Sequence, residues 1–392
     1  MGLYESMTAH LNAISKAGLR RTVTSKRQNG SKIIVDAKEY VNLSSNDYLG
    51  LASNLELSQN FFDSLSSSDL RMSSSGSPLL TGAHEAYDKA ALIMEELFNK
   101  KALFFNSGFA ANSGVIAALS DEKTLIVADK LSHASMIDGM SLSKGKCLRY
   151  RHNDYEHLER IIVSNKDLYD SIIVVTEAVF SMDGDRCSID ALCALKKKYK
   201  NLYLYIDEAH SFCLFNDNGA GLCALSGHLN EVDFILTTFG KGLGSQGACL
   251  LCSETSRDYL INVCRSLIFS TALAPLSFLH NAFMIEYMQK HNEMRERLHS
   301  ISSFIQNAID EKGICHNVSE SQIIPLIVFE NQMALEASAY FREKGFYAMP
   351  IRHPTVPKGQ ARLRLSLTAS LSDGEVELLK ETIRDFIDRF MK

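Results

Sequence analysis

The chain has 392 residues, of which 46% are hydrophobic, and 41 basic against 46 acidic side chains give a formal net charge of -5. This apolar content suffices for a buried core in one to three domains and excludes disorder as the main state. The acidic balance argues against binding of nucleic acid through phosphate neutralisation. Because no segment has the pattern of a membrane span or a signal peptide, we expect a cytoplasmic protein.

The nine cysteines are an odd number scattered along the chain, which is typical of free thiols in a reducing compartment. Cys249 and Cys252 have the spacing of a metal-binding or redox pair. No second pair of cysteines or histidines lies near them in the sequence to complete such a site. We therefore interpret this pair as part of a buried apolar strand and predict no metal centre.

Residues 1–45 predict an N-terminal arm, in which a helix is followed by a short pair of strands around 31–43. A serine-rich segment follows at 64–77. Such segments are usually flexible connectors, but their small side chains also suit a loop that lies against a ligand. The residues alone leave both interpretations open.

Residues 46–285 predict a large α/β domain. Short β-rich runs alternate with segments of helical period, and several runs are apolar throughout, as expected where helices cover both faces of a parallel sheet. The runs occupy residues 102–106, 124–129, 171–177, 202–207, 233–239 and 248–253.

Residues 286–392 predict a smaller C-terminal α+β domain. A helical stretch over about 276–312 leads into it from the large domain. The pattern then predicts, in order, a strand at 322–330, a helix at 333–345, a strand at 361–369 and a helix at 373–392.

Chemistry-bearing side chains follow the predicted strands, and open α/β sheets bind ligands at the carboxyl ends of their strands. Gly108 would let backbone N–H groups at a helix start approach a phosphate, although a plain turn would look the same. Asp207 closes an apolar strand and could hold a protonated ring nitrogen, with His210 beside the same ligand. The letters DEAH at 207–210 also occur in helicases, but the phosphate loop GxxxxGK[ST] is absent.

Lys241 stands between Gly240 and Gly242 after another apolar run. Glycines at this place let a flat ligand lie against the backbone. The hydroxyls of Thr237 and Thr238 could donate to a phosphate. A partly desolvated lysine has a lowered pKa and can form a Schiff base, so Lys241 is the predicted nucleophile.

His133 and Glu177 also follow strands and would lie at the same edge of the sheet. Together with the residues above they form a phosphate cradle, a carboxylate for a ring nitrogen, two imidazoles and an amine. This set matches the needs of pyridoxal 5'-phosphate, whose ring acts as an electron sink while its nitrogen stays protonated. We therefore predict that cofactor.

The sequence resembles the α-oxoamine synthases, a branch of the fold-type-I pyridoxal-phosphate enzymes, from about Leu19 to its last residue. The resemblance implies a large domain with a mainly parallel seven-stranded sheet, a small C-terminal α+β domain and a homodimer with shared active sites. It rests on the combination of SSNDYLGL (44–51), NSGFAAN (106–112), DKLSHASMIDG (129–139), TEAVFSMDGD (176–185), DEAHS (207–211), TFGKGLGSQGA (238–248), FSTALAP (269–275) and IRHPTVPKGQARLRLSLTA (351–369).

The resemblance assigns catalytic roles residue by residue. It implies that Lys241 carries the Schiff base and that Asp207 pairs with the pyridine nitrogen of the cofactor. It further implies that His210 contacts the ring hydroxyl and that His133 stacks on the ring face. Glu177 would line the site with them.

The resemblance also implies binding residues. The further cofactor contacts would be Gly108, Phe109 and Thr238 around the phosphate, Ser181 near the cofactor, and Ser270 and Thr271, which would reach the phosphate of the neighbouring subunit. Arg364 would take the carboxylate of an amino acid, with Asn46 nearby. Arg20 and Thr355 would meet the acyl substrate.

Within this branch the sequence is most similar to the biotin-pathway enzymes that condense L-alanine with a pimeloyl thioester, carried by coenzyme A or a carrier protein, and release carbon dioxide. The alternatives are a glycine C-acetyltransferase, another synthase of the branch, a sugar-aminotransferase-like enzyme and a catalytically silent scaffold. Pro78, Tyr87 and Cys213 stand where an arginine, a histidine and a glycine are common in the family. These departures bear on substrate choice and leave the lysine chemistry intact.

Overall fold

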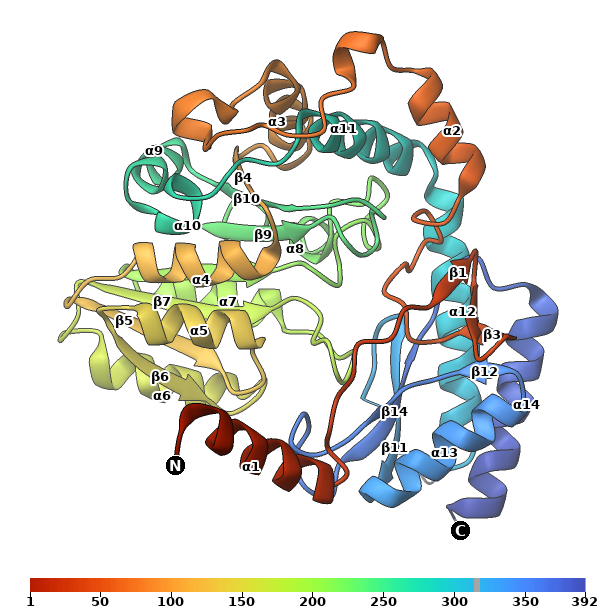
Figure 1. The fold of residues 1–392 in the computed structure, drawn as a ribbon. Helices are drawn as coiled ribbons and strands as arrows, with labels where there is room; N and C mark the ends of the chain where they lie inside the picture. Colours follow the sequence, from red (N-terminus) through yellow and green to blue (C-terminus); the bar gives the residue numbers. More distant parts are fainter. Residues whose placement is uncertain (314–317, 392) are drawn as a thin grey trace.

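A seven-stranded sheet forms the centre of the structure, a computed structural model that describes residues 1–313 and 318–391 (Figure 1). Its order is β4-β10-β9-β8-β7-β5-β6. β10 is antiparallel to both neighbours, and the other pairs are parallel. The strands are β4 (Lys101–Phe105), β5 (Thr124–Asp129), β6 (Lys146–Tyr150), β7 (Ser171–Glu177), β8 (Leu202–Asp207), β9 (Phe234–Thr238) and β10 (Ala248–Cys252). The predicted mainly parallel seven-stranded sheet is confirmed.

Helices cover both faces of this sheet, which explains why several of its strands are apolar throughout (Figure 1). Along β8, Leu204 and Ile206 belong to one buried cluster and Tyr205 to another, because successive side chains point to opposite faces. The covering helices are α3 (Glu85–Phe98), α4 (Gly108–Ala118), α5 (Ala134–Leu142), α6 (Tyr155–Asn165), α7 (Ile189–Lys198), α8 (Leu222–Leu225), α9 (Glu254–Val263), α10 (Arg265–Ile268) and α11 (Pro275–Lys290).

The predicted helical stretch at 276–312 is two helices, interrupted at His291. α11 packs against α3 of the large domain, whereas α12 (Asn292–Asp310) packs against α14 (Asp373–Phe390). α12 therefore leads the chain into the C-terminal part. The domain boundary at 285–286 stays a prediction.

The C-terminal part contains a three-stranded antiparallel sheet with the order β11-β14-β13. Its predicted strands and helices are present with slightly different ends. The elements are β11 (Ile323–Phe329), α13 (Asn331–Glu343), β13 (Pro350–Ile351) and β14 (Ala361–Ser366).

The N-terminal segment joins the C-terminal part through a second small sheet. After α1 (Leu3–Lys16), the strands β1 (Arg27–Asn29), β2 (Lys32–Val35) and β3 (Lys38–Asn42) form an antiparallel run. β12 (Phe346–Tyr347) completes the sheet by pairing with β3 in parallel. The chain then enters the large domain through α2 (Leu55–Asp63).

The serine-rich segment lies against residues 272–276 rather than standing free. The backbone N–H of Ala272 donates to the carbonyl of Gly76 at 2.9 Å, and the hydroxyl of Ser74 donates to the carbonyl of Leu273. After a short 3₁₀ turn (Ser67–Asp69), the segment ends in a π-helical turn (Pro78–Gly82). Its backbone is therefore fixed next to the segment that contains Ser270 and Thr271.

The cysteines that the structure describes are free thiols, and Cys249 and Cys252 are buried in β10 as predicted. Cys315 lies outside the described residues. Within residues 1–313 and 318–391, helices long and apolar enough to cross a bilayer are absent.

Candidate active site

A pocket of about 500 Å³ lies at the carboxyl ends of the central strands. Strands β7, β8 and β9 end at Glu177, Asp207 and Thr238, and all three residues line it. The pocket brings together most of the predicted site residues. Those among its lining are Asn46, Gly108, Phe109, His133, Glu177, Asp207, His210, Thr238 and Lys241.

Lys241 projects from a tight turn after β9. Gly244 allows the turn, because it has a φ of +65° and a Cβ there would lie 2.7 Å from the backbone nitrogen of Ala52. The Ser245 hydroxyl anchors the turn to α11 through Asn281 Oδ1 at 2.6 Å. Burial lowers the pKa of Lys241 despite the nearby carboxylates of Asp207 and Glu177. The turn therefore presents a buried amine that is more easily deprotonated, as a nucleophile requires.

His210 links this amine to the wall of the pocket. Its Nε2 lies 2.9 Å from Lys241 Nζ and its Nδ1 lies 2.7 Å from the hydroxyl of Tyr48. Because that hydroxyl donates to Asn46 Oδ1 at 3.0 Å, we assign the His210 proton to Nδ1, which leaves Nε2 to accept from the lysine. Burial, and then the charge of Lys241, lower the pKa of His210 well below its usual value.

Asp207 is oriented by two donors. Its Oδ2 accepts a hydrogen bond from Asn112 Nδ2 at 2.8 Å, and its Oδ1 accepts one from the backbone N–H of Ala209 at 2.8 Å. Asn112 also donates to Ser135 Oγ, which lies 2.8 Å from His133 Nδ1. The carboxylate and the imidazole that line the pocket are thus parts of one hydrogen-bonded set.

Two buried polar atoms of the pocket wall, Glu177 Oε1 and Thr238 Oγ1, lack a hydrogen-bond partner in the described part of the chain. Buried polar atoms almost always have a partner, so these two point to a polar ligand. Burial, and then the charge of Asp207, raise the pKa of Glu177 to about 8. Its carboxyl group is therefore mostly protonated at neutral pH and can donate to a ligand.

One end of the pocket is built for an anion. Gly108 begins α4, whose first turn has unpaired backbone N–H groups. A Cβ at Gly108 would lie 2.5 Å from Thr238 Cγ2, so glycine is required for this close packing. The unpartnered Thr238 hydroxyl lies beside the helix start. Together they provide neutral donors for a phosphate.

The remaining predicted residues lie around the pocket rather than in its lining. Arg364, on β14, donates from Nε to the carbonyl of Ser181 at 2.5 Å and from Nη1 to Asn46 Oδ1 at 3.2 Å. Thr355 lies farther out and accepts a hydrogen bond from Arg21 at 3.1 Å.

The other outlying residues are exposed or line a second hollow. Arg20 is exposed, and Ser270 and Thr271 line a hollow next to the pocket together with Pro78 and Tyr87. The predicted roles of these residues stay predictions.

Sequence reasoning gave no role to Asn112, Ser135 or Tyr48. A signal exists for Asn112, which is a lone amide within a helix of small residues and is buried. The family departure at Cys213 also finds an explanation. Its φ of +72° is a conformation that favours glycine, and the Cys213 side chain is fully buried there.

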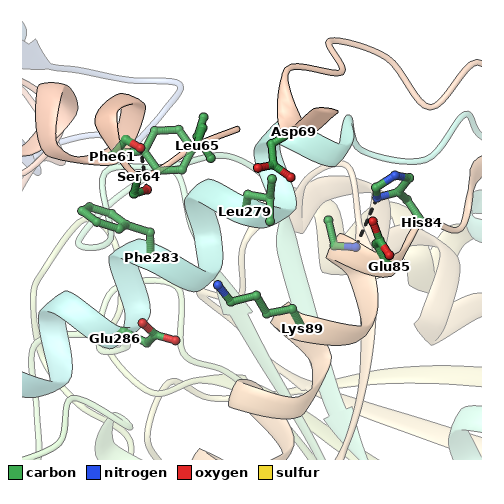
Figure 2. Close-up of a pocket in the computed structure, with 11 residues that line it drawn as sticks. Phe61, Ser64, Leu65, Asp69, His84, Glu85, Lys89, Leu279, Phe283 and Glu286 are labelled. Carbon is green, nitrogen blue, oxygen red and sulfur yellow. Dashed lines mark hydrogen bonds between the residues drawn. The ribbon is translucent and has the colours of Figure 1, made fainter. Parts of the chain in front are cut away.

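A separate pocket of about 460 Å³ lies between α2, α3 and α11 (Figure 2). Its floor is apolar, with Phe61, Leu279 and Phe283, and its rim carries charged groups such as Lys89 and Glu286. Among the described residues, those that line this pocket include none of the predicted site residues. It is therefore distinct from the pocket around Lys241.

One group of possible metal ligands lies away from the pocket, at Cys193, His228 and Glu231. His228 is already bound on both sides, with Nδ1 2.9 Å from Glu231 Oε1 and Nε2 2.8 Å from Asp190 Oδ1. Hydrogen bonding to Glu231 raises the pKa of His228. Both ring nitrogens are therefore already used, and the imidazole can donate to both carboxylates only when it is protonated.

The chain is similar in sequence to known proteins along most of its length. The sequence model of the aminotransferase class I and II family matches residues 38–383. An 8-amino-7-oxononanoate synthase of Haemophilus ducreyi is 41% identical over 93% of this chain and 96% of its own length.

Two solved structures are also similar to this chain. A crystal structure of 8-amino-7-oxononanoate synthase from Francisella tularensis has a TM-score of 0.70 and 27% identity, over 89% of this chain and 98% of its own. A serine palmitoyltransferase of Sphingomonas wittichii has a TM-score of 0.88 and 25% identity, over 99% of this chain and 98% of its own.

Proposed function

This chain belongs to the aminotransferase class I and II family, and from that premise we propose that it is an 8-amino-7-oxononanoate synthase. The reaction condenses L-alanine with a pimeloyl thioester and releases a thiol and carbon dioxide. The observation that carries the proposal is the buried amine of Lys241, 2.9 Å from His210 Nε2 in a pocket that also contains Asp207. The similarity to the Haemophilus ducreyi synthase over nearly the whole chain supports the choice of substrates.

The residues of the pocket fit pyridoxal 5'-phosphate. Thr238 Oγ1 and the start of α4 offer donors to its phosphate, and the unpartnered threonine hydroxyl is the observation that supports this. Asp207, fixed by Asn112 and Ala209, would hold its ring nitrogen. Lys241 would hold its aldehyde carbon. When bound, this cofactor supplies an electron sink for negative charge that develops on a substrate carbon.

The chain's own residues supply proton transfer and orientation. Lys241 is buried with a lowered pKa, so its amine can take and return a proton at the substrate carbon. Burial lowers the pKa of His133 and favours its neutral imidazole, although the charge of Asp207 acts in the opposite direction. Glu177 keeps its proton at neutral pH and can donate it to a ligand oxygen.

Arg364 is the proposed receptor for the carboxylate of L-alanine. The residue is only 9% exposed, and its guanidinium donates to the Ser181 carbonyl and the Asn46 amide oxygen at the margin of the pocket. Arginine suits this role because its fork of donors matches a carboxylate. Arg20 and Thr355 are proposed to meet the acyl chain farther out.

The proposed working unit is a homodimer, in which Ser270 and Thr271 reach the phosphate of the neighbouring subunit. Thr271 lies at the edge of the pocket of its own chain, since its carbonyl accepts a hydrogen bond from Asn106 Nδ2 at 2.9 Å. Asn106 itself lines the pocket.

A substrate panel tests the function. The purified protein with pyridoxal 5'-phosphate is given L-alanine, glycine or L-serine, each with pimeloyl-, acetyl- or palmitoyl-coenzyme A, and released thiol is measured. We expect release with L-alanine and pimeloyl-coenzyme A. A parallel reaction with a pimeloyl carrier protein identifies the carrier. Release only with glycine and acetyl-coenzyme A would assign the chain to the glycine C-acetyltransferases instead.

A further inference from the structure

His152 lies outside the pocket and joins two buried carboxylates. Its Nδ1 is 2.9 Å from Asp129 Oδ1 and its Nε2 is 2.7 Å from Asp185 Oδ2. The histidine side chain is 26% exposed, and those of Asp129 and Asp185 are 0% and 11% exposed. Its ring also packs edge-on against Phe180, with 4.4 Å between the ring centres. Both nitrogens of the half-buried imidazole thus face carboxylates that are almost fully buried.

Imidazole can donate to both carboxylates only when it is protonated. Burial opposes the charge, but the hydrogen bonds and charges of Asp129 and Asp185 outweigh it and raise the pKa of His152 to about 10. At neutral pH the group is therefore a cation between two anions. Charge-assisted hydrogen bonds of this kind are stronger than neutral ones and fix geometry.

The Asp129 end of this arrangement determines the turn that precedes His133. Asp129 is the last residue of β5, and its Oδ1 also accepts the backbone N–H of Leu131 at 2.8 Å. Its Oδ2 accepts the backbone N–H of Asn153 at 3.0 Å. The turn thus leaves β5 in a fixed direction and reaches His133 at the wall of the pocket.

The Asp185 end determines the loop after β7. The carbonyl of Asp185 accepts the N–H of Phe180 at 2.9 Å, which closes the loop that contains Ser181. The Ser181 carbonyl in turn holds Arg364 at 2.5 Å. The carbonyl of Gly184, the residue before Asp185, accepts the N–H of Glu320 from the C-terminal part at 3.0 Å. This loop therefore supports the β14 arginine from the large domain.

From these contacts we propose that His152 is a positioning residue that fixes the turn before His133 relative to the loop that holds Arg364. His152 would contact neither the cofactor nor the amino-acid substrate. It acts through Asp129 on one side and Asp185 on the other. The consequence for substrate rests on the proposed function, in which Arg364 binds the carboxylate of L-alanine.

The chain offers a matched control in His228. That histidine also lies between two carboxylates, at 2.9 Å and 2.8 Å, and its side chain is 22% exposed. Its partners Glu231 and Asp190 are outside the pocket lining among the described residues. His152→Gln and His228→Gln therefore each remove an imidazole that bridges two carboxylates. Only the imidazole of His152 is connected to the pocket.

The first test is amide hydrogen exchange on the holoenzyme, which needs no substrate. We expect His152→Gln to speed exchange at Leu131 and Asn153 on one side and at Glu320 on the other. The expected factor is about tenfold, the effect of losing one charge-assisted hydrogen bond. His228→Gln should leave these amides unchanged. Unchanged exchange, or faster exchange on one side only, would overturn the proposed link.

The second test is calorimetric titration of the holoenzymes with L-alanine in the absence of a thioester. His152→Gln should raise the dissociation constant about tenfold, and His228→Gln should not change it. An unchanged constant in His152→Gln would overturn the positioning role even if exchange is faster. If the wild type itself does not bind L-alanine, the proposed substrate is wrong, and the exchange test still decides the link.

A milder variant serves if His152→Gln does not fold. Asp185→Asn keeps the size of the side chain and a hydrogen bond to Nε2 but removes one charge. The same two groups of amides should exchange faster, by a smaller factor than in His152→Gln. Unchanged exchange in a folded Asp185→Asn variant would contradict the proposal.

Discussion

The pocket around Lys241 and the cluster around His152 are both buried groups of ionisable side chains, yet their charges differ. In the pocket, burial lowers the pKa values of Lys241 and His210 and raises that of Glu177, so the neutral forms are favoured. In the cluster, two carboxylates raise the pKa of His152 to about 10, so the charged form is favoured. The difference lies in the charge of the partners, because His152 faces two carboxylates whereas His210 faces an amine and a hydroxyl.

The largest effect on activity is expected when the amine of Lys241 is removed. Lys241→Ala should abolish the visible absorbance of the lysine-bound cofactor and reduce turnover by at least ~10²–10⁴-fold, the share of proton transfer alone. Absorbance spectra and thiol release at saturating L-alanine measure both. A variant that kept the wild-type spectrum would contradict the assigned role.

The next effect concerns Asp207, the proposed partner of the cofactor's ring nitrogen. Asp207→Asn keeps the shape of the side chain and its contact with Ala209 but removes the negative charge from the pocket. Turnover should fall by ~10²–10³-fold, as when one preorganised electrostatic contact is removed from an active site. The variant should still absorb in the visible range, because Lys241 is intact. Full turnover in Asp207→Asn would exclude a role for the charge.

The cluster should show a pH-dependent contribution to stability. The folded pKa of His152 is raised from 6.5 to about 10, so its contribution is complete below pH 6.5 and is lost as pH rises toward 10. Burial raises the pKa values of the neighbouring Tyr150, Tyr155 and Cys187, which favours their neutral forms. His152→Gln should lower the free energy of unfolding by about 3 kcal/mol at pH 6, and by less at pH 9.

Urea unfolding of the holoenzymes at several pH values measures this difference. The control variant His228→Gln should lose much less at every pH, because its partner carboxylates Asp190 and Glu231 are far more exposed than Asp129 and Asp185. If both variants lost the same unfolding free energy, burial of the partner carboxylates would not determine the strength of these ion pairs.

The last prediction concerns how the stability of the cofactor-free protein changes with pH. The pKa of Glu177 is raised from 4.5 to about 8, so the cofactor-free protein becomes less stable as pH rises between these values. Glu177→Gln lacks this titration. Relative to the wild type it should gain about 1.4 kcal/mol in unfolding free energy per pH unit within that range. Parallel stability curves of the two cofactor-free proteins would show that Glu177 titrates normally.

The sequence predicted the central strands and the residues at their ends because both are local signals. Asp207 and Lys241 each follow an apolar run, and parallel strands bring their carboxyl ends to one edge. β6 was missed because it is an edge strand with Lys146 and Arg149 exposed. Its short, charged pattern does not indicate a buried strand.

Contacts between distant segments were beyond sequence reasoning. The hydrogen bond from Asn112 to Asp207 depends on how α4 is rotated against the sheet, and periodicity does not determine that angle. The interruption at His291 between α11 and α12 likewise follows from packing, since one helix contacts α3 and the other contacts α14. The link from His152 to two separate loops has no local signature at all.

The pairing of β3 with β12 ties the order of synthesis to the order of folding. Val41 leaves the ribosome early but finds its partner Phe346 only after roughly 300 further residues, a wait of roughly 15–60 s at ordinary translation rates. The large sheet uses only strands made in between, so it can assemble first. A nascent chain arrested before residue 346 should therefore contain a folded centre with an exposed N-terminal strand, a ready substrate for chaperones and proteases.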